Sequence, residues 1–259
     1  MPEILEIEIY RRLADRVVGR AITGVNTPDG WYLKGCTADA VADAVIGATV
    51  VEARRRGKLL LLDLDDHRPT IGLRFGMTGR LIIDGDAAID SLEYSSDRND
   101  PAWDRFSLRF DHGSLVMRDP RRLGGVELDP DEERLGVDAW SLQADQLGAA
   151  LKGGRGPLKA RLLDQQRIAG LGNLLTDETL WRAGIDPHRT SGELQAAEIE
   201  RLAAAVHEVL DQLDRRGGSH LGDLQDERHR EGVCPVDGAA LQRDKVGGRT
   251  TYWCPKHQV

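Results

Sequence analysis

The spacing of apolar residues changes once along the chain, and this change constrains the fold more than any other feature. Between residues 49 and 118, short aliphatic and β-branched runs alternate with Gly, Asp and Pro turns, which is typical of strands. From about Ser141 the spacing becomes helical, most clearly where Leu202, Val206, Val209 and Leu213 form one stripe. The sequence therefore predicts an α+β fold, with a sheet-rich first part and a helical second part.

The individual elements can be predicted from the same patterns. Residues 3–18 are predicted to form a helix, and Thr37 is predicted to cap a second helix over residues 38–46. Strands are predicted at 49–53, 58–64, 70–75, 80–83, 105–110 and 114–118, and later helices at 144–152, 157–164, 174–183 and 193–215. The tail after Gly217-Gly218 is too short to hold a core of its own, so a metal or a neighbouring domain must order it.

Composition limits the class of protein. The chain has 259 residues, enough for one large or two modest domains. Its three cysteines are too few for a disulfide framework, which indicates a reducing compartment. The sequence contains no run of eighteen apolar residues, and the acidic start does not look like a leader peptide. We therefore expect a cytoplasmic protein without a membrane partner.

The first eight residues, Met1-Pro2-Glu3-Ile4-Leu5-Glu6-Ile7-Glu8, place a carboxylate beside a proline. If Met1 is removed, Pro2 becomes a secondary amine that can attack an aldehydic carbon and form a charged iminium ion. Glu3 would then lie within reach to transfer protons. Alternatively, Pro2 only presets the first helical turn and the glutamates favour the helix dipole.

This N-terminus resembles the start of the formamidopyrimidine-DNA glycosylase and endonuclease VIII family, Met-Pro-Glu-Leu-Pro-Glu-Val-Glu. Leu163-Asp164-Gln165 with Ala169-Gly170-Leu171-Gly172-Asn173 resembles the helix-two-turn-helix of that family, and Arg249-Thr250-Thr251-Tyr252-Trp253-Cys254 resembles its zinc-finger hairpin. The resemblance covers nearly the whole chain. It implies a β-sandwich with flanking helices over residues 1–135, a helix-two-turn-helix domain over 136–225, and a zinc-finger-like β-hairpin over 226–259.

The resemblance also implies a function. The protein would be a bifunctional DNA glycosylase and abasic-site lyase, acting as a monomer on damaged DNA. Pro2 would form the Schiff base, Glu3 would transfer protons, and Lys58 would be the hairpin lysine near the damaged strand. Strand cleavage would follow by β or β,δ elimination. Lys58 could equally be a surface cation at the start of a strand.

Six further residues are implied to contact DNA. Lys159, Asn173 and Arg249 would bind phosphates, whereas Met77, Arg121 and Leu123 would fill the space left by the flipped base. Leu123 stands where the family has an aromatic residue, and methionines such as Met77 more often fill a core. Because the net charge is −8, DNA binding requires cations gathered on one face. Clusters such as Arg54-Arg55-Arg56-Gly57-Lys58 and Arg121-Arg122 suggest such a basic groove.

The tail departs from the family at its metal ligands. The family spacing C-x2-C-x16-C-x2-C is kept, but the ligands are Cys234, Asp237, Cys254 and His257. Cysteine and histidine suit zinc, and an aspartate oxygen is an uncommon ligand in a structural site. We expect one structural zinc ion, with His229 as a reserve ligand. The alternative is a metal-free hairpin held by packing.

The interval before the finger also differs from relatives that act on oxidised purines. Only residues 220–233 separate the last predicted helix from the finger, so the usual purine-capping loop is shortened. We therefore expect a protein nearer the endonuclease VIII branch. A second hypothesis is a lesion- or structure-recognising DNA-binding protein that has lost base excision.

Overall fold

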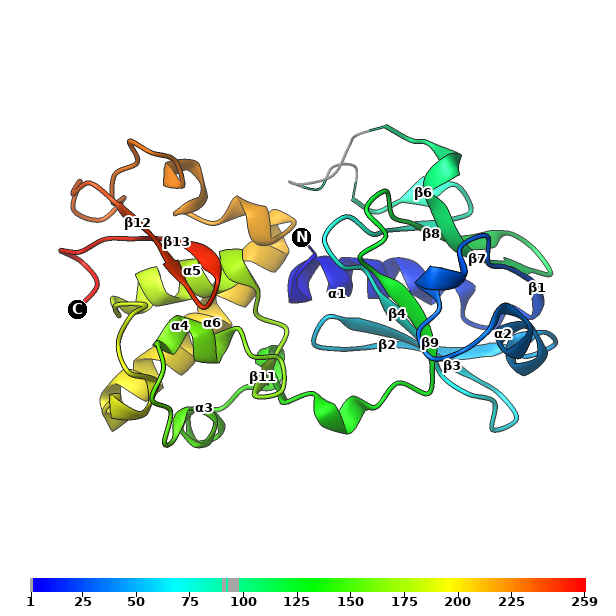
Figure 1. The fold of residues 1–259 in the computed structure, drawn as a ribbon, viewed down its shortest axis with the longest axis horizontal. Helices are drawn as coiled ribbons and strands as arrows, with labels where there is room; N and C mark the ends of the chain where they lie inside the picture. The colour runs from blue at the N-terminus through cyan, green and yellow to red at the C-terminus, as the bar shows by residue number, and fades with distance from the viewer. Residues whose placement is uncertain (1, 90–91, 93–97) are drawn as a thin grey trace. The chain divides into compact units, whose positions relative to one another are not determined.

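The computed structural model describes residues 2–89, 92 and 98–259, and these residues form two compact units. The N-terminal unit comprises Pro2 and Glu6–Glu132, and the C-terminal unit comprises Glu3–Leu5 and Glu133–Val259. Figure 1 shows strands concentrated in the first unit and helices in the second. The predicted α+β fold is confirmed. The division of the second part into 136–225 and 226–259 stays a prediction.

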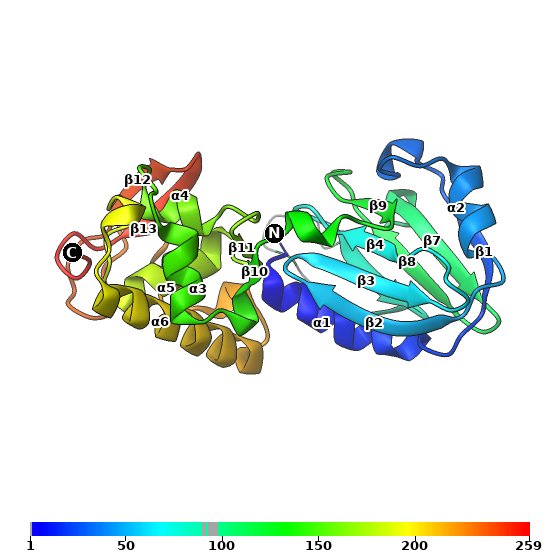
Figure 2. The ribbon, with the colours of Figure 1, turned by 90° about the horizontal axis from the view of Figure 1, so that it is seen from below.

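Two antiparallel sheets build the N-terminal unit. One has the strand order β1-β7-β8-β5-β6 and the other the order β2-β3-β4-β9. Figure 2 shows β2, β3 and β4 running side by side. The strands are β1 (Ile22–Asn26), β2 (Val50–Arg56), β3 (Leu59–Leu64), β4 (Ile71–Arg74), β5 (Arg80–Ile83), β6 (Asp86–Ala87), β7 (Asp104–Phe110), β8 (Ser114–Arg118) and β9 (Gly125–Leu128).

The six predicted strands are all present, and β1, β6 and β9 are additional. Apolar side chains of both sheets join one buried cluster, as expected for a sandwich. Helix α1 (Ile4–Ala14) continues as a 3₁₀ turn, Asp15–Val17, so the first predicted helix is confirmed. Its Tyr10 is fully buried in this cluster, and the hydroxyl donates to Gly79 O at 3.2 Å.

The predicted cap of the second helix is also present. Thr37 Oγ1 accepts a hydrogen bond from Ala40 N at 3.2 Å at the start of α2 (Ala38–Val45). The other short 3₁₀ turns of this unit are Gly30–Tyr32 and Pro101–Trp103.

Helices dominate the C-terminal unit, which has its own buried aliphatic cluster. Its helices are α3 (Ala144–Leu151), α4 (Leu158–Leu162), α5 (Asn173–Ala183) and α6 (Ala196–Arg216), and two short strands pair in parallel, β10 (Val137–Asp138) and β11 (Ile168–Ala169). Four 3₁₀ turns accompany them, at Ala139–Ser141, Ser191–Glu193, Ser219–Leu221 and Gln225–Glu227, and a fifth, Glu132–Arg134, begins at the last residue of the N-terminal unit. Gly217 ends α6 in the left-handed conformation, with φ 109°. None of the described helices is long and apolar enough to span a membrane.

The tail forms a hairpin of β12 (Gln242–Val246) and β13 (Arg249–Trp253). The two linking residues, Gly247 and Gly248, have φ values of 59° and 75°, and two positive φ angles are typical of a type I′ turn. Near the hairpin, Trp181 of α5 packs in a small apolar cluster with Leu224, Cys234 and Cys254. The tail is thus anchored on the helical part of its own unit.

Candidate functional site

The carboxylate of Glu3 is bound at the N-terminus of α5. It accepts hydrogen bonds from the backbone amides of Gly172 at 2.7 Å, Leu174 at 2.9 Å and Leu175 at 3.2 Å. The side chain is 1% exposed. The first N–H groups of a helix have no partner within the helix and carry a partial positive charge, so they stabilise an ionised carboxylate. The residue that follows Pro2 in the chain is therefore fixed in place.

A glycine at position 172 makes this contact possible. A Cβ atom there would lie 2.2 Å from Glu3 Cδ, which no real contact allows. Gly170, with φ 117°, forms the turn that precedes α5, and its carbonyl oxygen accepts a hydrogen bond from Ile4 N at 3.1 Å. A glycine-rich turn before a helix commonly presents its backbone amides to a phosphate. The amides of residues 172, 174 and 175 are instead bound to Glu3.

Asn173 remains a polar group without a complete set of partners at this helix terminus. It is the first residue of α5 and is half-buried. Its Oδ1 has no hydrogen-bond partner among the described residues. Because a buried amide oxygen without a partner is costly, this side chain is suited to an external polar group.

Lys159 is buried, contrary to the expectation that it contacts a phosphate directly. Its side chain is fully inaccessible, and Nζ lies 2.6 Å from Asp177 Oδ1 and 2.7 Å from Thr251 Oγ1. Burial lowers the pKa of Lys159, and the charge of Asp177 offsets part of this shift. Arg228 forms a second ion pair with Asp177. Removing one partner from such a buried pair typically costs about 3–5 kcal/mol, so the network is structural.

This network holds the strand that carries Arg249. Lys159 Nζ also donates to Thr250 O at 3.1 Å, next to the exposed Arg249 at the start of β13. No ion pair to the Arg249 guanidinium occurs among the described residues. Lys159 therefore positions the hairpin, and Arg249 presents the free cation.

In the N-terminal unit, two loops lie against each other and bring Met77 and Leu123 to one region. A Cβ atom on Gly76 would lie 2.4 Å from the backbone carbon of Leu123, so the two loops touch at that point. Met77 is half-buried and belongs to none of the described core clusters, whereas Leu123 is 51% exposed. The described packing thus does not support a core role for Met77.

Asp119 organises these loops, and sequence reasoning missed it. It is fully buried and accepts hydrogen bonds from Thr78 Oγ1 at 2.5 Å, Gly124 N at 2.8 Å and Arg121 N at 3.2 Å. The signal was available, because an aspartate before Pro120-Arg121 is a common acceptor for turn amides. Arg121 itself is exposed.

Lys58 lies in the two-residue turn between β2 and β3, where Arg56 pairs with Leu59. Its side chain is half-buried. The structure thus places Lys58 at the tip of a hairpin, as the resemblance implied.

Several arginines, among them Arg54 of the expected basic groove, are neutralised within the protein. Arg54 pairs with Asp63 and Glu132, and Arg74 pairs with Glu127 at 2.5 Å. Arg118 pairs with Asp104 at 2.5 Å in the same way. Any DNA contact must therefore rest on fewer cations than the sequence suggested, such as Arg121 and Arg249.

Three of the four predicted metal ligands come together in the tail. Ligand atoms of Cys234, Asp237 and Cys254 all lie within 4.8 Å of one another, and both carboxylate oxygens of Asp237 are 3.6 Å from Cys254 Sγ. Burial raises the pKa of the Cys254 thiol, while the amide of Ala239 lowers the pKa of Asp237. Two sulfurs and a carboxylate at this spacing fit a zinc ion.

His257 is near this cluster but is not part of it. Its backbone amide lies 3.2 Å from Cys254 Sγ, and its Nε2 lies 2.9 Å from Trp181 O. A carbonyl oxygen can only accept, so Nε2 is the donor in this contact, and in the neutral tautomer with this donor Nδ1 keeps a lone pair. Metal-bound histidines commonly donate their second ring N–H in this way. The reserve ligand His229 is instead exposed, and its Nε2 lies 3.8 Å from Glu227 Oε2.

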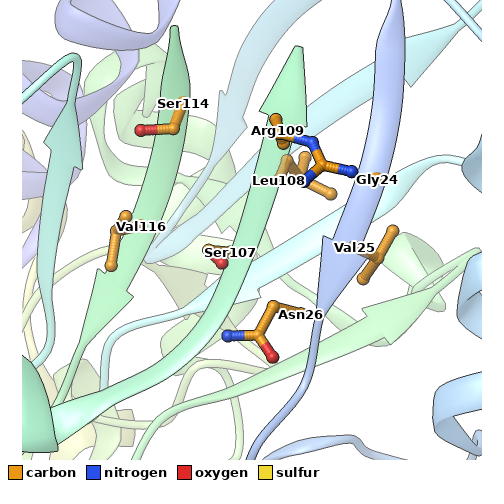
Figure 3. Close-up of a pocket in the computed structure, with 8 residues that line it drawn as sticks. All are labelled: Gly24, Val25, Asn26, Ser107, Leu108, Arg109, Ser114 and Val116. Atoms are coloured by element: carbon orange, nitrogen blue, oxygen red, sulfur yellow. The ribbon is translucent and has the colours of Figure 1, made fainter.

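One hollow of the N-terminal unit involves none of these residues. It has a volume of about 290 Å³ and lies on a face of the five-stranded sheet over β1, β7 and β8 (Figure 3). The guanidinium of Arg109 extends over Gly24, where a Cβ would lie 2.7 Å from Nη2. Gly24 thus leaves room for this guanidinium, and a side chain at position 24 would displace it.

Comparison with known proteins decides the family. The model of the formamidopyrimidine-DNA glycosylase N-terminal domain matches residues 1–126, and that of the formamidopyrimidine-DNA glycosylase H2TH domain matches residues 135–223. The chain belongs to the formamidopyrimidine-DNA glycosylase family. It is therefore an enzyme of DNA repair.

Relatives and solved structures agree with this assignment. The chain is 36% identical to formamidopyrimidine-DNA glycosylase of Paracoccus denitrificans, over 98% of this chain and 99% of the relative. It is 35% identical to that of Jannaschia sp., over the full length of both. A Lactococcus lactis Fpg structure, a complex with DNA containing an abasic site, covers 99% of both chains at 25% identity and a TM-score of 0.83.

The names of these relatives indicate to which branch of the family the chain is more similar. All the relatives described above are formamidopyrimidine-DNA glycosylases, so they favour that branch over the endonuclease VIII branch that the short interval 220–233 predicted. The alignment with the Jannaschia relative spans 294 positions, 35 more than this chain has residues. A short chain is thus compatible with similarity to formamidopyrimidine-DNA glycosylases.

Proposed function

We propose that the protein excises damaged bases from DNA and then cleaves the strand at the resulting abasic site through a Schiff base on Pro2. One observation carries the proposal. The carboxylate of Glu3, adjacent to Pro2 in sequence, is fixed by three backbone amides at the start of α5. A proton-transfer group must be held in place to act efficiently, and a buried carboxylate next to a terminal amine has this property.

In the proposed chemistry Pro2 acts first and Glu3 acts after it. The Pro2 nitrogen, free once Met1 is removed, attacks the anomeric carbon, and the damaged base leaves with the bonding electron pair and takes up a proton. Glu3 supports sugar ring opening and the later proton transfers. The resulting iminium ion acidifies the neighbouring sugar C–H, so loss of that proton eliminates the phosphate. Hydrolysis of the imine releases Pro2.

We propose that residues of both units bind the DNA. Arg249 and Asn173 would contact phosphates, with Lys58 near the damaged strand, while Met77, Arg121 and Leu123 would fill the space of the flipped base. The exposure of Arg121, Leu123 and Arg249 supports this assignment. The names of the relatives favour formamidopyrimidine-type lesions as substrates.

Borohydride trapping tests the proposal. The purified protein is incubated with a duplex that contains an abasic site, and sodium borohydride reduces any Schiff base to a stable covalent adduct. We expect one adduct per active molecule and none with an intact duplex. Binding to abasic DNA without any adduct would instead identify a lesion-binding protein that has lost base excision.

We also propose that Cys234, Asp237, Cys254 and Nδ1 of His257 hold a structural zinc ion. The ion would order the short tail that carries Arg249, because a segment of this size has little core of its own. The clustering of the first three ligands and the hydrogen bond of His257 Nε2 to Trp181 O support this set.

Metal analysis distinguishes the candidate ligands. We expect about one zinc per chain, released in Cys254→Ser but retained in Cys36→Ser, because Cys36 lies in the other unit. His257→Ala should lower zinc content and His229→Ala should not. The opposite result would transfer the fourth position to His229. A folded, active protein without zinc would show that packing alone orders the hairpin.

A further inference from the structure

A short segment, Asp29–Lys34, runs along the loop that carries Arg121 and Leu123. Lys34 N donates to Val126 O at 2.7 Å, and Leu33 forms a parallel bridge with Val126. The carboxylate of Asp29 accepts two hydrogen bonds from the guanidinium of Arg122, at 2.5 and 2.6 Å. The segment, which leads into α2 in Figure 1, is therefore held by this loop at Asp29 and by the following strand β9 at Leu33 and Lys34.

Buried groups fix the middle of the segment. Tyr32 is fully buried, and a Cβ atom on Gly124 would lie 2.5 Å from its hydroxyl oxygen. The carboxylate of Asp29 also accepts from Trp31 N at 3.2 Å. Because the residues on both sides of Trp31 are anchored in this way, its backbone has little freedom.

Trp31 nevertheless faces solvent. Its side chain is 69% exposed, more than Leu123 at 51%. Lys34 Nζ lies 5.0 Å from the centroid of the indole ring and donates to Trp31 O at 2.8 Å. An exposed indole on an anchored backbone, with a cation over its ring, is preorganised for binding rather than for packing.

We propose that Trp31 stacks on a nucleobase of the bound DNA, beside the region that Leu123 occupies, and that Lys34 approaches the neighbouring phosphate. This inference rests on the proposed function, because it requires that the protein binds damaged DNA. Leu123 lacks an aromatic face, and Trp31 supplies one from an adjacent segment.

The surroundings of Trp31 favour DNA over a protein partner. Lys34 lies over the indole, and Asp29, two residues before Trp31, forms an ion pair with Arg122, so charged groups lie close to the ring. A flat apolar protein surface would bury the Lys34 ammonium without an anion to pair with it. A nucleobase offers a π-face for the indole and an adjacent phosphate for the cations, the combination that single-strand binding surfaces use.

Equilibrium binding to a duplex with a borohydride-reduced abasic site tests the inference, because this DNA cannot be cleaved. We expect Trp31→Ala to raise Kd by about 5- to 150-fold, the range that loss of one base–aromatic stack corresponds to. Trp31→Phe should stay within about 3-fold of the wild type, since phenylalanine keeps a stacking face. The matched control is Val51→Ala, which removes another exposed apolar side chain of the same unit and should leave Kd unchanged.

Salt dependence separates stacking from charge. Lys34→Ala should reduce the slope of log Kd against log salt by about one, because one phosphate contact is lost. Trp31→Ala should weaken binding with the same slope as the wild type. If Trp31 acted only by holding Lys34 in place, Trp31→Ala would reduce the slope as Lys34→Ala does.

The possible failures are distinguishable. If the wild-type protein does not bind the abasic duplex, the proposed function is wrong. If the wild type binds and Trp31→Ala binds equally well, the inference about Trp31 is wrong and the function stands. If Trp31→Ala instead changes the sedimentation coefficient from dimer to monomer with unchanged Kd, the indole contacts a second copy of the chain, which also overturns the inference.

Discussion

Replacing Pro2 by glycine is expected to reduce borohydride trapping on abasic DNA by about 100-fold or more. The proline ring fixes the position of the secondary amine, and its iminium ion is charged at every pH. A terminal glycine is a flexible primary amine, and its imine acts as an electron sink only when it is protonated. Trapping yield at fixed time, quantified on denaturing gels, measures the effect. Binding to a reduced abasic duplex should change little.

A second variant identifies the nucleophile independently of side-chain geometry. One additional residue that remains attached before Pro2 converts the amine to an amide, which cannot form an iminium ion. Trapping should then disappear while the fold is retained. If this extended protein still forms the adduct, and Lys58→Ala removes it, the nucleophile is Lys58 and our assignment of Pro2 is wrong.

Gly172→Ala is expected to lower the rate of base excision by about 100-fold, because it displaces the carboxylate of Glu3. The new Cβ would lie 2.2 Å from Glu3 Cδ, so the carboxylate must leave its three amide donors. Gly172 has φ −119°, which alanine adopts without strain, so the backbone itself is not the target of the substitution. Single-turnover excision from a lesion-containing duplex measures the effect.

The control for this variant is Gly156→Ala in the same unit. A Cβ at position 156 meets nothing within 4 Å, and its backbone is not left-handed, so excision should keep its wild-type rate. Glu3→Gln adds a test of charge. It should impair excision more than cleavage at a preformed abasic site, because only the first reaction needs help with departure of the base. Wild-type excision by Gly172→Ala would exclude Glu3 as the proton-transfer group.

Several elements could be predicted because local sequence determines them. Helix α2 begins after its capping residue Thr37, α6 ends before Gly217, and six strands follow from aliphatic runs between turn residues. Strands β1 and β9 were missed, since Gly24 and Gly125 interrupt the β-branched pattern that marks a strand. Their place in the sheets depends on pairing with distant strands. In β1, Gly24 leaves room for the Arg109 side chain of β7, which no local pattern indicates.

The sequence by itself determined the chemical groups, the order of sheet and helices, and the family, since these depend on residue type and short-range spacing. Only the tertiary structure decided which groups meet. Glu3 finds its amide donors about 170 positions along the chain, and Lys159 is neutralised by Asp177 and covered by β13. Trp31 is exposed although its neighbour Tyr32 is buried. Burial and pairing arise from long-range packing, and a linear pattern contains no information on which distant side chain completes a contact.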